Sequence, residues 1–120
     1  MEVENMPTDQ LSVTFQALAD PTRRAMMARL ARGEASVQEL AKPFKMSQPA
    51  ISKHVKVLEK SGLIVRRSLA QQRLCKLQAK PMEDAMSWME HQRKILEEQL
   101  DKLEDYLQEI QKKGKKHDPS

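Results

Sequence analysis

The 120-residue chain is poor in cysteine, glycine and aromatic residues, and each shortage excludes a class of protein. A single cysteine, Cys75, excludes an intrachain disulfide framework and a zinc site built on several cysteines. Three glycines leave no glycine-rich loop that could cradle a phosphate. No pairing of nucleophile and base stands out, so we expect neither an enzyme nor a bound cofactor or metal.

Long apolar stretches are also missing. The longest aliphatic runs, such as residues 63–65, fall far short of the roughly 20 residues that span a bilayer. The first five residues contain two glutamates and no apolar run, which predicts no secretory signal peptide. We therefore expect a cytoplasmic, single-domain protein that does not associate with membranes.

The formal net charge of +4 hides a strong segregation of charge along the chain. Residues 21–80 hold fourteen Lys and Arg against three Asp and Glu, whereas residues 1–20 and 81–111 carry net charges of −4 and −6. A basic block of this kind indicates a polyanionic partner, which the acidic flanks would avoid. Double-stranded DNA is the partner that this pattern favours.

Capping signals and apolar spacing predict four short helices in the first half of the chain. Asp20, Ser36 and Ser47 are typical N-cap residues, and Glu39 completes a capping box with Ser36. We predict a helix-turn-helix over about residues 36–61, inside one domain at 9–113. The segments 1–8 and 114–120 are expected to be flexible ends.

After Gly62 the pattern changes to β-branched, alternating residues, which predicts a hairpin or wing over about residues 63–77. A long helix is predicted over about 81–113. Its apolar residues alternate at steps of four and three, the seam of a coiled coil that is interrupted only at Arg93. The seam residues assigned to a dimer interface are Met86, Met89, Leu96, Leu100, Leu103, Leu107 and Ile110.

The helix that begins at Ser47 has a polar and basic side. Gln48 can pair bidentately with adenine, Ser52 can contact either kind of base, and Lys53 can reach guanine or a phosphate. An ordinary amphipathic helix with a solvated face is the alternative. The basic block and the cations of the hairpin favour DNA.

Two stretches carry a family resemblance. Residues 18–24, LADPTRR, and 47–64, SQPAISKHVKVLEKSGLI, resemble the ArsR/SmtB family of transcriptional regulators. The resemblance implies a mainly α-helical fold, the winged helix-turn-helix. Its small β-wing is a hairpin between the fourth and fifth helices. It also implies a homodimeric repressor that binds a palindromic operator. The first and last helices then form the dimer interface, so Leu11, Phe15 and Leu18 of the first helix join the interface residues named above. The implied DNA contacts are Gln48, Ser52, Lys53, His54 and Lys56 on the recognition helix, Arg66, Arg67 and Arg73 on the wing, and Arg23, Arg24 and Gln38 on neighbouring helices.

Many members of that family sense metals through cysteines or histidines, and this chain departs from their pattern. Residues 36–42 contain neither residue type, and Asp84 and His91 are not followed by a second histidine in the last helix. The resemblance therefore indicates a metal-independent branch with an unknown effector. A metal- or thiol-responsive sensor, recognised by a tenfold effect of zinc or oxidant on operator affinity, is one alternative. A helical adaptor dimer that does not bind DNA is the other.

Overall fold

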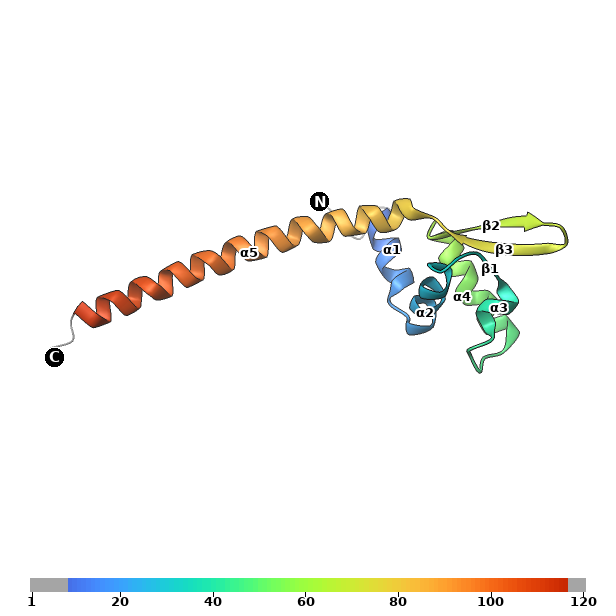
Figure 1. Ribbon diagram of the computed structural model, residues 1–120, viewed down its shortest axis with the longest axis horizontal. Coiled ribbons are helices and arrows are strands. Elements are labelled where there is room, and N and C mark those ends of the chain that lie inside the picture. The colour runs from blue at the N-terminus through green and yellow to red at the C-terminus, as the bar shows by residue number, and fades with distance from the viewer. Residues whose placement is uncertain (1–8, 117–120) are drawn as a thin grey trace, which may run out of the picture. The chain divides into compact units, whose positions relative to one another are not determined.

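The computed structural model describes residues 9–116, which form two compact units, one ending at Ala85 and the other beginning at Met86 (Figure 1). The last helix, α5 (Ala79–Lys116), starts in the first unit and provides the described part of the second. The other elements of the first unit are α1 (Gln10–Leu18), α2 (Pro21–Leu30), β1 (Ala35–Ser36), α3 (Val37–Ala41), α4 (Gln48–Lys60), β2 (Ile64–Leu69) and β3 (Gln72–Leu77).

Each of the first four helices begins at a residue whose side chain accepts a hydrogen bond from the first turn. These N-caps are Asp9, Asp20, Ser36 and Ser47. At Ser36 the capping box is complete: Glu39 N–H donates to Ser36 Oγ at 3.1 Å, and Ser36 N–H donates to Glu39 Oε1 at 2.9 Å. The caps predicted at Asp20, Ser36 and Ser47 are confirmed. They can be predicted from the sequence because capping depends on neighbours within three residues.

The core of the first unit lies where α2, α3 and α4 meet the small sheet. One side of α4 supplies Ile51, Val55 and Leu58, all fully buried. Other buried members of the cluster are Met26, Leu30, Leu40, Leu63, Ile64 and Cys75. Burial of one side of α4 leaves its opposite side exposed.

The sheet has three antiparallel strands in the order β1-β3-β2. The predicted hairpin accounts for two of them, β2 and β3. In the hairpin Ile64 lies opposite Leu77 and Leu69 opposite Gln72, and Ala70 turns the chain with φ of 57°. The sequence reading missed β1, because a two-residue strand has no period of its own. It forms only because it pairs with residues 74 and 75 of β3.

The last helix is longer than the sequence reading predicted. It starts at Ala79 rather than Pro81 and continues past Gly114 to Lys116, so the predicted ends at 81 and 113 are both wrong. Proline is tolerated in a first turn, where its missing N–H has no helical partner. A single glycine inside a helix costs about 1 kcal/mol and does not by itself end it. Residues 1–8 and 117–120, predicted to be flexible, lie outside the described residues.

Within residues 9–116, none of the helices combines the length and the apolar character needed to cross a membrane.

Candidate nucleic-acid interface

The exposed side of α4 brings together most of the residues predicted to read DNA. Gln48, Lys53 and Lys56 are exposed and Ser52 is half-buried, while the buried side of the helix anchors it to the core. The helix has no acidic residue in its first turn, and Ser47 caps it. Its N-terminal half therefore presents amide, hydroxyl and ammonium groups to solvent on a rigid element, which suits contacts to the edges of bases.

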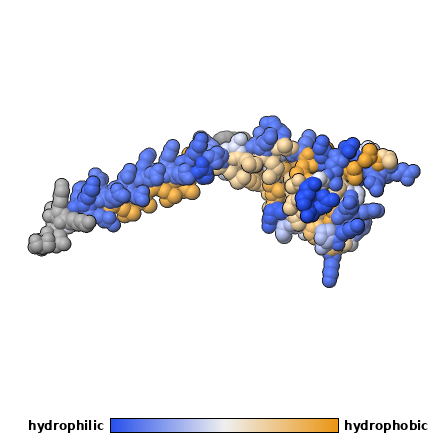
Figure 2. Space-filling view, in the orientation of Figure 1, coloured by the Kyte–Doolittle hydropathy of each residue, from blue (hydrophilic) through white to orange (hydrophobic). Residues whose placement is uncertain are grey.

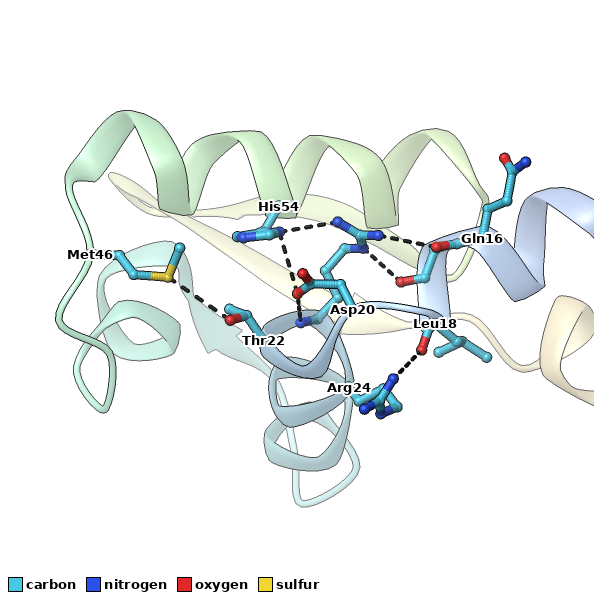
Figure 3. A network of polar contacts seen from close by, with 9 residues as sticks. Gln16, Leu18, Asp20, Thr22, Arg24, Met46 and His54 are labelled. Carbon is cyan, nitrogen blue, oxygen red and sulfur yellow. Dashed lines mark hydrogen bonds and ion pairs between the residues drawn. The ribbon is translucent and has the colours of Figure 1, made fainter.

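His54 is placed differently from its neighbours on α4. Its side chain is only 18% exposed, and its Nδ1 atom lies 3.2 Å from Arg23 Nη1 and 3.8 Å from Asp20 Oδ2 (Figure 3). A guanidinium can only donate, so Nδ1 accepts this hydrogen bond and a neutral His54 carries its proton on Nε2. His54 thus joins the recognition helix to the start of α2, and its predicted contact with DNA stays a prediction.

Arg23 and Arg24, both predicted to contact phosphates, are engaged with the end of α1. Arg23 donates from Nε to the carbonyl oxygen of Ala17 at 2.6 Å and from Nη2 to that of Gln16 at 3.0 Å. Arg24 donates to the carbonyl oxygen of Leu18 at 2.9 Å (Figure 3). These bonds supply partners to carbonyl groups at the C-terminus of α1, of which that of Gln16 also accepts from the backbone N–H of Ala19 at 3.2 Å.

Asp20 completes this junction between α1, α2 and α4. The backbone N–H of Arg23 donates to its carboxylate at 3.0 Å, and this bond together with the nearby Arg23 guanidinium lowers the pKa of Asp20 below its ordinary value. The carboxylate is therefore ionised at neutral pH and holds the cap.

Replacement of Arg23 by alanine is expected to lower the free energy of unfolding by about 1–2 kcal/mol, because two carbonyl groups and His54 lose a shared partner. Arg24→Ala, which loses one exposed bond, is the matched control and should cost less than about 0.5 kcal/mol. Urea denaturation of both variants measures the difference. Equal losses would show that Arg23 does not hold the junction together.

Two of the three arginines of the wing form ion pairs within the fold. Arg67 donates to both carboxylate oxygens of Glu34 at 2.8–3.0 Å, which raises the pKa of Arg67 and lowers that of Glu34. Arg66, with 20% of its side chain exposed, places Nε 3.3 Å from Glu59 Oε1. Both pairs tie the wing to other elements, a role that sequence reasoning did not foresee.

A polar cleft of about 250 Å³ lies between the start of α3 and the outer part of the wing. It collects three predicted DNA contacts, Gln38, Arg66 and Arg73, from α3, β2 and β3. Its other lining residues are Ser36, Val37, Gln71 and Gln72. Sequence reasoning missed Ser36 and Gln72 here, because only the pairing of β1 with β3 brings the start of α3 beside the wing. In the part of the chain that is described, Arg73 has no ion-pair partner, which leaves its charge for a ligand.

The predicted dimer residues separate into two groups. On α1, Leu11, Phe15 and Leu18 are half-buried, and Leu18 packs against the core of its own unit. The seam of α5 is exposed instead, from 45% at Met89 to 59% at Met86. Figure 2 shows these residues as an apolar stripe along a helix that is otherwise hydrophilic. An apolar stripe of this length on a single chain indicates that another helix covers it.

Cys75 is fully buried in the core, and this burial raises the pKa of its thiol. Among residues 9–116, no three His, Cys, Asp or Glu side chains are grouped so that they could hold a metal ion. A buried thiol with a raised pKa is a poor nucleophile.

A helix-turn-helix whose second helix has a basic exposed side, followed by a β-wing, defines the class of winged helix-turn-helix DNA-binding proteins. A family model described as a helix-turn-helix domain matches residues 18–67. The chain is 46% identical over 63 residues to the HTH-type transcriptional regulator Rv2034 of Mycobacterium tuberculosis, a match that spans 52% of this chain and 59% of that protein. It is 31% identical over 75 residues to the transcriptional repressor SdpR of Bacillus subtilis, spanning 62% of this chain and 83% of that repressor.

Among solved structures, an ArsR family transcriptional regulator matches with a TM-score of 0.69 and 44% identity, covering 77% of this chain and 97% of that one. The chain belongs to the ArsR family of transcriptional regulators. The predicted family and the winged-helix fold are therefore confirmed.

Proposed function

We propose that this protein is a cytoplasmic, homodimeric repressor that binds a palindromic operator and responds to no metal. The observation that carries the proposal is the exposed side of α4, which presents Gln48, Ser52 and Lys53 on a helix anchored by three fully buried residues. Membership of a family of transcriptional regulators supports it.

In this proposal the N-terminal half of α4 enters the major groove. Gln48 and Ser52 hydrogen-bond to base edges, Lys53 contacts guanine or a phosphate, and Lys56 and His54 lie further along the same helix. Two chains related by twofold symmetry place two copies of α4 on one side of the duplex. The half-sites then lie about 10 bp apart, or a multiple of that spacing.

The cleft between α3 and the outer part of the wing supplies contacts to the DNA backbone. Arg73 and Gln38 approach a phosphate from two sides, and Arg66 adds charge from the inner wall. Arg67 can contribute through the half of its side chain that remains exposed beside Glu34. Arg23 and Arg24 act beside the α1–α2 junction, where Arg23 reaches His54 in the middle of α4. Such contacts position the protein and carry no sequence information.

Titration of labelled operator DNA with the protein, at salt concentrations from about 50 to 200 mM, tests the proposal. We expect binding that weakens steeply with salt and that palindromic competitor DNA displaces in preference to random DNA. Absence of binding at the lowest salt would overturn the proposal and favour an adaptor that binds an acidic protein.

Arg73→Ala is expected to make the plot of log affinity against log salt shallower by about 2, because each dimer loses two phosphate contacts. The loss should be equal on operator and random DNA. Lys102→Ala, which removes the same charge from the second unit, is the matched control and should leave the slope unchanged. An unchanged slope for Arg73→Ala would argue against a phosphate in the cleft.

A further inference from the structure

A cleft of about 590 Å³ lies between α2 and α3, and it is called the α2–α3 cleft below. None of the predicted DNA contacts lines it, and neither α1 nor α5, the helices of the proposed dimer interface, contributes a residue to it. Pockets that hold small organic molecules have volumes of roughly 300–1,000 Å³. The cleft is therefore large enough for a ligand, and its place in the fold leaves it outside the surfaces already assigned.

The floor of the α2–α3 cleft is apolar. Met26 and Leu40, which both line it, are fully buried members of the core. Phe44, from the turn before α4, is half-buried and packs against the same core. Ala25 and Ala28 line the cleft from α2 and are exposed, so their short side chains leave its space unfilled. An aromatic ring placed here would gain apolar contacts and could stack on Phe44.

Two arginines bring positive charge to the cleft, and they differ in their engagement. Arg29 donates from Nη1 to the carbonyl oxygen of Gly33 at 3.1 Å, and its Nη2 atom lies 4.0 Å from Glu39 Oε2. Arg32 is exposed, and its side chain has no hydrogen bond or ion pair with any of residues 9–116. The guanidinium of Arg32 is therefore available to a ligand in the cleft.

Glu39, the acidic residue of the cleft, does not neutralise both arginines. Its Oε1 atom accepts from the backbone N–H of Ser36 at 2.9 Å in the capping box, and this bond lowers the pKa of its carboxyl group. Glu39 is thus ionised at neutral pH, and two arginines with one glutamate leave a net charge of +1 in the cleft. One carboxylate on a ligand would balance that charge.

We propose that the α2–α3 cleft binds a small aromatic monocarboxylate. Its ring lies against Met26, Leu40 and Phe44, and its carboxylate pairs with the free guanidinium of Arg32. A guanidinium suits this ligand because it binds a carboxylate through two parallel hydrogen bonds and also stacks on aromatic rings. An uncharged aromatic molecule would leave Arg32 without a partner, and a dicarboxylate would bring a surplus negative charge beside Glu39.

Methyl NMR of the full chain, with isotope-labelled methionine methyl groups, tests this site with cinnamate as the probe. Met26 reports from the floor of the cleft, and the Met26→Leu variant identifies its signal. Ring currents of bound cinnamate should shift that signal, with a dissociation constant of about 1 mM or tighter, as expected for a ligand of this size. Met86 and Met89 report on the apolar stripe of α5 in the same spectrum. A shift confined to these two signals would overturn the proposal.

The charge of the ligand is tested by pairing a variant with an uncharged analogue. Arg32→Ala should weaken the binding of cinnamate about fivefold, the upper range for an exposed ion pair, and should leave the binding of cinnamyl alcohol unchanged. Lys60→Ala removes one charge from the last turn of α4, outside the cleft, and is the matched control that should change neither. Equal effects of Arg32→Ala on both ligands would overturn the proposed pairing.

The space in the cleft is tested by filling it. Ala28→Phe enlarges an exposed side chain of α2 and should abolish the shift of the Met26 signal by cinnamate, because the new ring takes the place of the ligand. Ala31→Phe, at an exposed position that does not line the cleft, is the matched control and should bind as the wild type does. Far-ultraviolet circular dichroism checks that both variants fold. Full binding by a folded Ala28→Phe protein would place the ligand elsewhere and overturn the proposal.

Discussion

Leu100→Asp is expected to convert the protein to a monomer and to weaken operator binding by about a hundredfold or more. Leu100 lies near the middle of the exposed seam and is 54% exposed in the single chain, so the change does not disturb the fold of either unit. In a dimer the same position would place two carboxylates between apolar layers, where each charge loses its hydration without gaining a partner. Loss of the dimer then removes one of the two recognition helices from the operator.

Sedimentation equilibrium and an operator titration measure the two parts of this result. Gln108→Asp, which introduces the same carboxylate at an exposed position away from the seam, should remain a dimer and bind normally. A dimer that survives Leu100→Asp would show that the seam is not the interface. A monomer with full operator affinity would show that one chain is sufficient for DNA recognition.

Gln48→Ala is expected to weaken operator binding by about 30-fold or more while leaving binding to random DNA nearly unchanged. A bidentate contact between glutamine and adenine discriminates by about 1–3 kcal/mol, and the dimer carries two copies. Gln48 is exposed in the first turn of α4, and the cap of that helix comes from Ser47, so truncation leaves the helix intact. Gln108→Ala in the second unit is the matched control.

The measurement is a pair of titrations, one with operator DNA and one with random DNA of the same length, at one salt concentration. Ser52→Ala, one turn further along the same side of α4, should show the same preference with a smaller loss. Equal weakening on both DNAs would assign Gln48 to the phosphate backbone instead of a base.

Local signals in the sequence were sufficient for much of the fold. Ser36 and Glu39 are three residues apart, and the apolar side of α4 repeats within two turns, so cap and core face could be predicted without knowledge of any distant residue. The predicted ends of α5 were wrong for the opposite reason. Pro81 and Gly114 are weak local signals, and the long helix continues through both residues.

The residues of the candidate site were predicted, but the ion pairs and hydrogen bonds that they form within the fold were not. Arg67 is paired with Glu34, 33 positions earlier, and Arg23 reaches His54, 31 positions later. No spacing rule connects residues so far apart, and each pair exists only because separate elements pack together. Arg66 beside Glu59 is a further cation whose charge is partly neutralised by the fold.

The sequence by itself determined the basic central block, the caps, the polar side of the recognition helix and the heptad period of α5. These features are short-range patterns, in which a residue and its neighbours within one or two turns carry the whole signal. The tertiary structure alone decided which cations remain available for DNA, how β1 brings α3 to the wing, and that the seam of α5 is uncovered in a single chain. The physical reason is that pairing and burial depend on groups that meet only when the chain has folded.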